Sequence, residues 1–239
     1  GGFGVLAADF DGTNDSMKCG TWPSIDVDQG TFSCWLRLDG GNGVEQTLAE
    51  IESSNTGPDG YLIYRDAGNK IHFNFKAAGG NPGVELSTNN SYTSSATWLH
   101  ILIAWNSAVV GARHLYITDV SDLNVINFAD MNNSSTNGSF SIGARTVPSL
   151  RLNGCLAEFF FHNTFLDVSV LANRRKFISD TLKPVDLGPT GALPLGVQPL
   201  IYESIRPGEV VTAFATNRGS VGNFTITGTL DLASTSPSD

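Results

Sequence analysis

Oxygen-bearing side chains crowd into one short stretch near the amino terminus, "AADFDGTNDSM". The stretch contains Asp9, Asp11, Asn14 and Asp15. Carboxylate and amide oxygens are the ligands that calcium prefers. An EF-hand loop beginning at Asp9 would need glycine at its sixth position and glutamate at its twelfth, where this chain has Asn14 and Gly20. The stretch is therefore either a calcium loop of another kind or a tight turn between strands.

A second set of residues suits carbohydrate chemistry. Trp22 in "CGTWPSID", Tyr61 beside "NTGPDG" and Tyr92 in "TNNSYTSS" are aromatic residues in polar, turn-rich surroundings. Such rings stack on the apolar face of a sugar, while neighbouring amides and acids such as Asp59 bridge its hydroxyl groups. We therefore take Trp22, Tyr61, Tyr92 and Asp59 as candidate carbohydrate-binding residues, although each ring could equally cap the core.

Other reactive residues have simpler interpretations. Cys34 and Cys155 lie in apolar, strand-like runs and are interpreted as small buried residues, with one disulfide among the three cysteines as the alternative. There is no zinc-site spacing and no G-x-S-x-G motif, and all four histidines fall within predicted strands. The basic run 174–176 is interpreted as the solvated face of a short helix.

The elements that would position these residues are mostly strands. Short β-branched and aromatic runs alternate with Gly, Asn, Pro and Ser clusters, which predicts an antiparallel sandwich. In "KIHFNFK", Ile71, Phe73 and Phe75 share one face, while His72 and Asn74 share the other. The runs "LHILIAW" and "LAEFFFH" are apolar on both faces, so we expect central strands covered by the opposite sheet on one side and by loops or a partner on the other.

The last third of the chain has a different pattern. "DVSVLANRRKFISD" predicts a short helix capped by Asp167 or Ser169. Residues 182–199 form a Pro/Gly-rich connection, residues 200–232 carry two strand signals that we expect to pair as a hairpin beside the sandwich, and residues 233–239 are a polar tail expected to be loose or bound elsewhere.

Composition excludes several classes of protein. Hydrophobic residues make up 41% of the 239 residues and charged residues 15%, with 26 glycines, as in a turn-rich globular β protein. The net charge of −9 disfavours nucleic-acid binding and acidic membrane surfaces, because phosphate binding relies on Lys and Arg. No apolar run is long enough for a membrane helix, and no signal peptide is visible in the residues that follow Gly1, which leaves open what precedes Gly1.

Four landmarks occur in a familiar order: "FDGTNDSM", "GTFSCWLRL", "ATWLHILIAWN" with "LYITDV", and "FSIGA" followed by "LNGCLAEFFFHNTFLD". This order resembles the laminin-G-like jelly roll of the concanavalin A-like lectin and glucanase superfamily over residues 5–180. The resemblance implies an all-β fold, a two-sheet antiparallel jelly-roll domain over residues 1–181, extended by the short helix and the C-terminal hairpin. Asp119-Val120 replaces the Asp-Gly turn common after the tyrosine strand, so that turn must be built differently.

The resemblance bears on both candidate sites. Glucanases of this superfamily carry an E-x-D-x-x-E strand motif, whereas the nearest acids here, Glu50 and Glu52, flank Ile51 with no third acid in register. The resemblance therefore implies no enzyme. It also makes Asp11-Gly12 a hairpin turn, with Asp15 opening the returning strand; calcium bound by Asp11 and Asp15 remains the alternative and needs ligands from another loop. No other cofactor is implied.

The final 40 residues, "PLIYES" and "AFATNRGSVGNFTITGTLDLASTSPSD", are similar to the endings of lectin-like virion proteins of tailed bacteriophages. We therefore expect a non-enzymatic protein at the surface of a phage particle that binds glycans of the host or its surroundings. The expected partners are other virion subunits and copies of the same chain, with neither nucleic acid nor membrane insertion. The alternative is a purely structural capsid-decoration or tail-fibre subunit, and a glycan-active enzyme is disfavoured.

Overall fold

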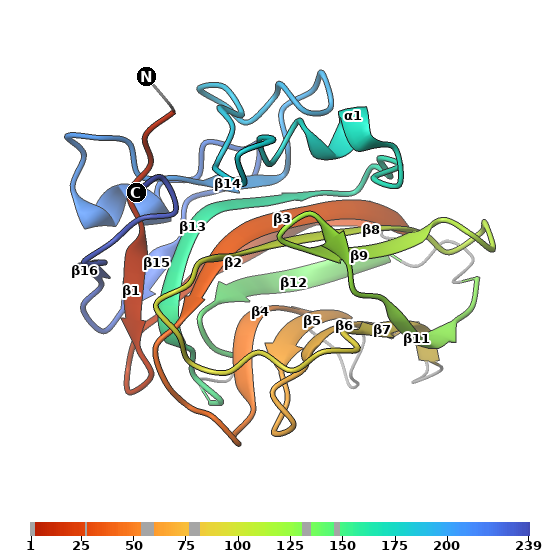
Figure 1. The fold of residues 1–239 in the computed structure, drawn as a ribbon, viewed down its shortest axis with the longest axis horizontal. Coiled ribbons are helices and arrows are strands. Elements are labelled where there is room, and N and C mark those ends of the chain that lie inside the picture. The colour runs from red at the N-terminus through yellow and green to blue at the C-terminus, as the bar shows by residue number, and fades with distance from the viewer. Residues whose placement is uncertain (1–2, 27, 54–59, 77–81, 131–134, 146–148) are drawn as a thin grey trace.

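The computed structural model describes residues 3–26, 28–53, 60–76, 82–130, 135–145 and 149–239. Two antiparallel sheets of eight strands each pack face to face (Figure 1), which confirms the predicted all-β jelly-roll sandwich. In the ranges given above, no helix is long and apolar enough to cross a membrane.

We call the two layers the back sheet and the front sheet. The back sheet contains, in spatial order, β10 (Val120–Ser121), β9 (Arg113–Ile117), β8 (Leu99–Asn106), β3 (Gln29–Leu38), β13 (Asn153–His162), β1 (Ala8–Asp11) and β16 (Asp231–Leu232), with β14 (Ile201–Glu203) also paired to β13. The front sheet contains β11 (Asn124–Phe128), β7 (Pro82–Ser87), β6 (Ile71–Lys76), β5 (Gly60–Arg65), β4 (Gln46–Ser53), β12 (Ser135–Ile142), β2 (Ser16–Asp26) and β15 (Thr225–Thr227). The helices are α1 (Leu171–Arg174) and the 3-10 helix η1 (Val211–Ala215).

The main core lies between the sheets and follows the predicted alternation. Ile71, Phe73 and Phe75 of β6 are buried in it, because alternate side chains of a strand point to the same face. The ring of Phe73 packs against Trp105 of β8, with 4.4 Å between the ring centroids. The alternate apolar residues of β6, predicted from their spacing, thus pack against the opposite sheet.

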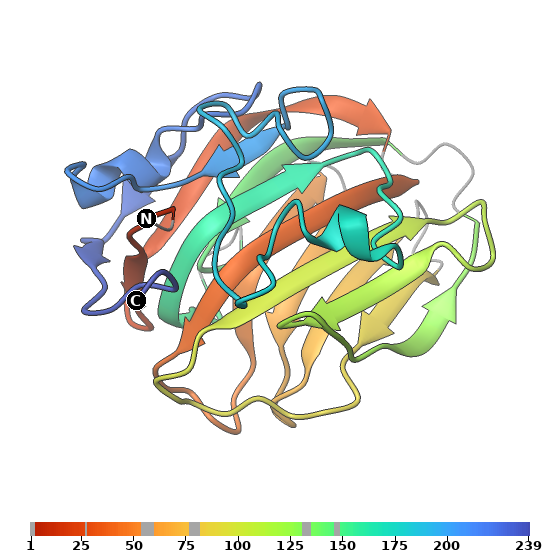
Figure 2. The same cartoon turned by 45° about the horizontal axis from the view of Figure 1, so that its top comes forward.

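The outer face of the back sheet carries two further apolar clusters. Leu102 of β8 and Phe160 of β13 are fully buried beneath the connection that runs from residue 165 to residue 195. This connection, with α1 in it, crosses the back strands in Figure 2. Trp35 and Ala157 belong to the second cluster, which the chain ends cover. The expected cover over strands that are apolar on both faces is thus supplied by the chain's own loops.

The basic run around α1 is wrongly predicted as a solvated face. Arg174 and Arg175 each donate to the carboxylate of Asp119 at 2.7 Å, and Lys176 donates to a backbone carbonyl oxygen. Asp119 lies in the turn between β9 and β10, where it and Thr118 have φ values of +67° and +48°. The missing Asp-Gly pair is thus replaced by a left-handed turn that two arginines hold in place.

The C-terminal segments do not pair with each other as the expected hairpin. β14 joins β13 of the back sheet, β15 joins β2 of the front sheet, and β16 joins β1 of the back sheet. The tail is also attached: the Ala233 amide donates to the Ala7 carbonyl, and Ser238 Oγ accepts from the Val5 amide. The last 40 residues therefore complete both sheets of the sandwich.

The stretch 11–15 is a turn, but not that of a hairpin. Phe10 is buried in the core and Gly12 has a φ of +74°, as expected for a turn. β1 pairs within the back sheet and β2 within the front sheet, so the turn carries the chain from one layer to the other. The hairpin expected here is corrected to a connection between the sheets.

Candidate functional site

The outer face of the front sheet presents an aromatic pair among polar groups. Tyr64 of β5 and His72 of β6 are direct cross-strand neighbours, and their rings stack with 4.8 Å between the centroids and 17° between the planes. His72 Nε2 lies 3.0 Å from Asp66 Oδ2, which fixes the imidazole against the tyrosine. Tyr64 is half-buried, whereas His72 is almost covered. The pair is a rigid, partly exposed aromatic surface.

A row of mostly polar residues crosses the front sheet beside this pair. Strand register places the members opposite one another in the order Lys18, Ser141, Glu50, Leu62, Asn74, Glu85 and Asn127. They share one face because directly opposed residues in antiparallel strands point the same way. We call Tyr64, His72, Glu50, Asn74 and Glu85 the front-face array. All three apolar clusters in the described residues lie between the sheets or on the back sheet, so none covers the array.

The array lies in an acidic environment. Burial, with the Glu45 and Glu85 carboxylates, raises the pKa of Tyr64 to about 12, so the phenol keeps its proton and can donate a hydrogen bond. Burial opposes ionisation of Asp66, but hydrogen bonds from the Lys70 amide and His72 hold the pKa of its carboxyl below the usual value. A surface of this kind favours neutral, hydroxyl-bearing ligands over anionic ones.

The acids of the array are too far apart for hydrolysis of a glycoside. Glu50 and Glu85 are on β4 and β7, three strand spacings apart, which puts their backbones about 14 Å from each other. Glycosidases need two carboxyl groups within about 5–10 Å. The arrangement therefore suits binding, with the aromatic pair under a sugar ring and the acids and Asn74 at its hydroxyl groups.

The predicted carbohydrate-binding residues do not come together in the described structure. Trp22 lies in β2 and Tyr61 in β5, which are separated in the front sheet by β12 and β4; only the strand positions of these two residues are described. Asp59 lies outside the described residues. Tyr92, in the loop before β8, donates its hydroxyl to Asp122 at 2.6 Å and packs against the main core.

The two predicted calcium ligands serve the turn between the sheets. Asp11 Oδ1 accepts from the amides of Thr13 and Asn14, and these hydrogen bonds lower the pKa of the Asp11 carboxyl. Asp15 is buried, and its two oxygens accept from the amides of Asp11 and Thr229. Backbone donors therefore account for the crowding of acids that first suggested calcium, and Asp15 also ties the turn to the one between β15 and β16.

The three cysteines are free and buried, which agrees with the interpretation of Cys34 and Cys155 as buried residues and not with the alternative of a disulfide. Cys155 has an additional role, because its sulfur lies with carboxylate oxygens of Asp9 and Asp39 in a group whose atoms are within 4.8 Å of one another. Arg37 lies on the same group, where it donates to both oxygens of Asp39 at 2.7 and 2.9 Å. The Arg37 guanidinium already binds both oxygens of the Asp39 carboxylate that a metal ion would need. We therefore interpret this group as an ion pair centred on Arg37.

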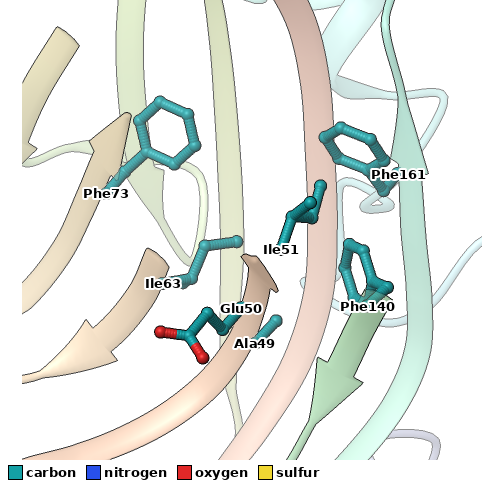
Figure 3. A pocket seen from close by; sticks show the side chains of 7 residues that line it. All are labelled: Ala49, Glu50, Ile51, Ile63, Phe73, Phe140 and Phe161. Atoms are coloured by element: carbon teal, nitrogen blue, oxygen red, sulfur yellow. The ribbon is translucent and has the colours of Figure 1, made fainter. Parts of the chain in front are cut away.

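The core also contains a small apolar cavity of about 10 Å³ (Figure 3). Its walls are Ala49, Glu50, Ile51, Ile63, Phe73, Phe140 and Phe161. Figure 3 shows the Glu50 carboxylate pointing away from Ile51 and the phenylalanines, as expected for a residue on the opposite face of β4. The cavity has room for about one water molecule and is too small for a sugar.

Sequence reasoning missed most of the array. The alternation in "KIHFNFK" placed His72 and Asn74 on the solvated face, but their neighbours Tyr64 and Glu85 come from other strands. Glu50 was identified only as an acid beside Ile51, and its position on the outer face of β4 follows from that alternation. The alternation within one strand predicts which of its residues face solvent. It does not predict which residues of neighbouring strands lie beside them, because that depends on the strand register.

Comparisons with known proteins agree with the fold. The sequence profile Laminin_G_3, which describes the concanavalin A-like lectin/glucanases superfamily, matches residues 11–170. A comparison with curated proteins gives no match. The fold is similar to that of a heptameric SAP-like pentraxin from Limulus polyphemus, with a TM-score of 0.50 and 13% identity over 68% of this chain and 77% of that one.

A second solved structure is similar over more of the chain. It is a "putative carbohydrate binding protein" from Bacteroides ovatus ATCC 8483, with a TM-score of 0.57 and 12% identity over 96% of this chain. The chain spans 59% of the length of that protein. At these identities the likeness shows a shared fold, and the C-terminal extension falls within the part compared.

Proposed function

The chain belongs to the concanavalin A-like lectin/glucanases superfamily, and on that premise we propose that it is a non-enzymatic protein whose front-face array binds neutral glycans. The observation that carries the proposal is the stacked Tyr64–His72 pair, which is partly exposed beside Asn74 and Glu85 on a face that no described apolar cluster covers. The pair offers a surface for the apolar side of a sugar ring. The Glu85 carboxylate can accept hydrogen bonds from the sugar hydroxyl groups, and the Asn74 amide can both accept from them and donate to them.

Two further observations bear on this proposal. The carboxylates of the array are separated by intervening strands, which supports binding without hydrolysis. The acidic surroundings of Tyr64 disfavour anionic sugars such as sialylated glycans. Individual sites on such an open surface are expected to be weak. Display of several copies together would multiply the affinity, which fits the expectation from the sequence that copies of this chain associate.

The test is a glycan array probed with a multivalent, labelled form of the protein. Tyr64→Ala is expected to lower the apparent affinity for the bound glycans about tenfold or more, because the stacking surface is lost. Tyr116→Ala is the matched control, since Tyr116 is a half-buried tyrosine on the outer face of the back sheet. The proposal is wrong if the multivalent wild-type protein binds no glycan, or if the two variants lose binding equally.

We also propose that the protein is exposed on a bacteriophage particle, together with other virion subunits. This rests on the sequence pattern of the last 40 residues and on the net charge of −9, which suits an exposed protein without nucleic-acid contacts. Antibody labelling of purified particles under the electron microscope tests it. Absence of the chain from particles of the phage whose genome encodes it would overturn this assignment while leaving glycan binding open.

The structural alternative draws on a different feature. β11 is an edge strand of the front sheet, and Val125 and Ile126 on it are 38% and 49% exposed. An apolar edge of this kind suits contact with a neighbouring subunit. Lysine substitutions at both positions should dissociate an assembled oligomer if the contact exists, and unchanged assembly would remove this alternative's support.

A further inference from the structure

A polar hollow of about 410 Å³ lies on the opposite side of the sandwich from the front-face array. Its walls come from three segments that are distant in sequence: the end of β3, the loop at residues 94–96 and the C-terminal residues Ser234 and Thr235. Both views place the C-terminus beside the back sheet near β1 (Figures 1 and 2). The volume is in the range of sites that hold small organic ligands.

The charged groups of the hollow are held rigidly. Arg37 is 8% exposed and forms two hydrogen bonds to Asp39, while Nη1 donates to Thr235 Oγ1 at 2.6 Å. Cys155 lies beneath them, with its sulfur 3.2 Å from both Arg37 Nη2 and Asp39 Oδ2. A guanidinium and a carboxylate fixed side by side offer donors and acceptors in one plane without a net charge.

Hydroxyl groups and an indole complete the surroundings. Ser94 is fixed by Asn42, which accepts from its amide at 2.8 Å and donates to its Oγ at 2.9 Å. Trp98 contacts two of the lining residues: its indole N–H donates to Thr235 at 3.3 Å, and its ring lies 5.6 Å from the Arg37 guanidinium carbon. Ser95, Ala96 and Thr235 are exposed, so the hollow opens to solvent.

From this arrangement we propose that the hollow is a second ligand site, which binds a neutral polyhydroxylated molecule of the size of a single sugar ring. Asp39 accepts from ligand hydroxyl groups, and Arg37 and the serine and threonine hydroxyls donate to its oxygens. Trp98 lies behind the lining, where it contacts Arg37 and Thr235 and so reports on the site. Arg37 and Asp39 cancel in charge, and the carboxyl group of Asp9 beside them adds no positive charge, which favours an uncharged ligand over a phosphate or carboxylate. The C-terminal segment is part of the site, so the segment that completes the sandwich also completes this hollow. The proposal is independent of binding at the front-face array.

The test is a nuclear magnetic resonance titration of ¹⁵N-labelled protein with glucose, galactose, mannose and N-acetylglucosamine, each added separately. The chain has four tryptophans, so the Trp98 indole signal can be assigned with Trp98→Phe. A saturable shift of this signal and of the Ser95 amide is expected with at least one sugar. Thr235→Ala should weaken that sugar's binding about fivefold, because one hydrogen-bonding partner of Arg37 and Trp98 is lost.

A matched pair of variants localises the binding. Ala96→Trp fills the hollow and should abolish the shift, whereas Ala108→Trp, at an exposed position after β8, should leave it unchanged. The inference is overturned by absence of a saturable shift with all four sugars, by persistence of the shift in Ala96→Trp, or by a response to inorganic phosphate in place of sugars. Tyr64→Ala separates the two sites. If this variant still binds glycans in the glycan-array experiment and still shows the sugar-induced Trp98 shift, the front-face proposal fails and this one stands.

Discussion

The outer faces of the two sheets differ in what lies on them. On the back sheet, Leu102 and Phe160 point outward and are fully buried under the chain between residues 165 and 195. On the front sheet, Leu62 and Asn74 point outward and remain partly exposed among acids. One face of the sandwich is therefore a second core, and the other is a surface.

This difference shows how the chain divides its tasks. The residues that follow β13 add apolar burial where the strands are apolar on both faces, which contributes to stability. They leave the front sheet accessible, and there the strands carry the aromatic and polar groups that suit a sugar. The covered part of the back face thus serves stability, and the front face carries the proposed array, so Leu102 and the array residues should affect different measurements.

The largest expected effect comes from a matched pair of leucine truncations. Leu102→Ala on the back face should lower the free energy of unfolding by about 2–5 kcal/mol, because it leaves a cavity in a buried cluster. Leu62→Ala on the front face should cost less than about 1 kcal/mol. Chemical denaturation measures both, and equal losses would mean that the front face is covered as well.

A buried acid in the back sheet provides a second test. Glu203 of β14 is fully buried and neither carboxylate oxygen has a hydrogen-bond partner in the structure, so burial raises its pKa well above the ordinary value. As pH rises above about 4, the unfolded chain releases this proton while the folded chain retains it, and stability therefore falls with pH. Glu203→Gln should be the more stable protein by about 1–3 kcal/mol at mildly alkaline pH and no more stable in acid.

The measurement for Glu203 is the free energy of unfolding across a pH series. Asp231→Asn is the control, since Asp231 is exposed on β16 and should leave the pH profile close to that of the wild type. An advantage of Glu203→Gln that does not change with pH would contradict the expected titration of the buried acid.

Asp119→Asn, in the left-handed turn beneath α1, should lower the free energy of unfolding by about 1–2 kcal/mol. Asp119→Asn keeps a side chain that tolerates positive φ but removes the charge that holds Arg174 and Arg175. Burial opposes ionisation of Asp119, yet the two arginines lower the pKa of its carboxyl. The stabilisation is thus present at neutral pH and is lost as pH falls through that lowered pKa, so wild type and variant should converge in strong acid. A pH-independent difference would assign the effect to backbone strain.

The smallest expected effect is on the front face. Glu85→Gln should change the free energy of unfolding by less than about 0.5 kcal/mol, because Glu85 is partly exposed. It should nevertheless lower the pKa of Tyr64 from about 12, since a nearby negative charge is removed. Ultraviolet titration of the phenols checks this, with Tyr64→Phe used to identify the signal. An unchanged titration would show that burial and the other carboxylates set this pKa.

Much of the fold could be predicted from short stretches. The alternation in "KIHFNFK" predicted which residues of β6 face the core, and the two-sided apolar runs of β8 and β13 predicted a cover on the outer face. The short helix was predicted in the right place, but α1 spans four residues, and its N-cap is Val170, without a side-chain hydrogen bond, where Asp167 or Ser169 was expected. The site could not be predicted in the same way, because Tyr64, His72 and Glu85 meet through the register of three strands.

What the sequence by itself determined is the character of each strand: which residues alternate, which runs are apolar on both sides, and where turns interrupt them. These are local properties, since side-chain direction follows from a period of two along a strand. The tertiary structure decided the partners. β15 and β16 pair with β2 and β1, more than 200 residues away, and the turn at Asp11–Asp15 joins two sheets where a hairpin was expected. Pairing of this kind depends on packing between distant segments, so no local pattern specifies it.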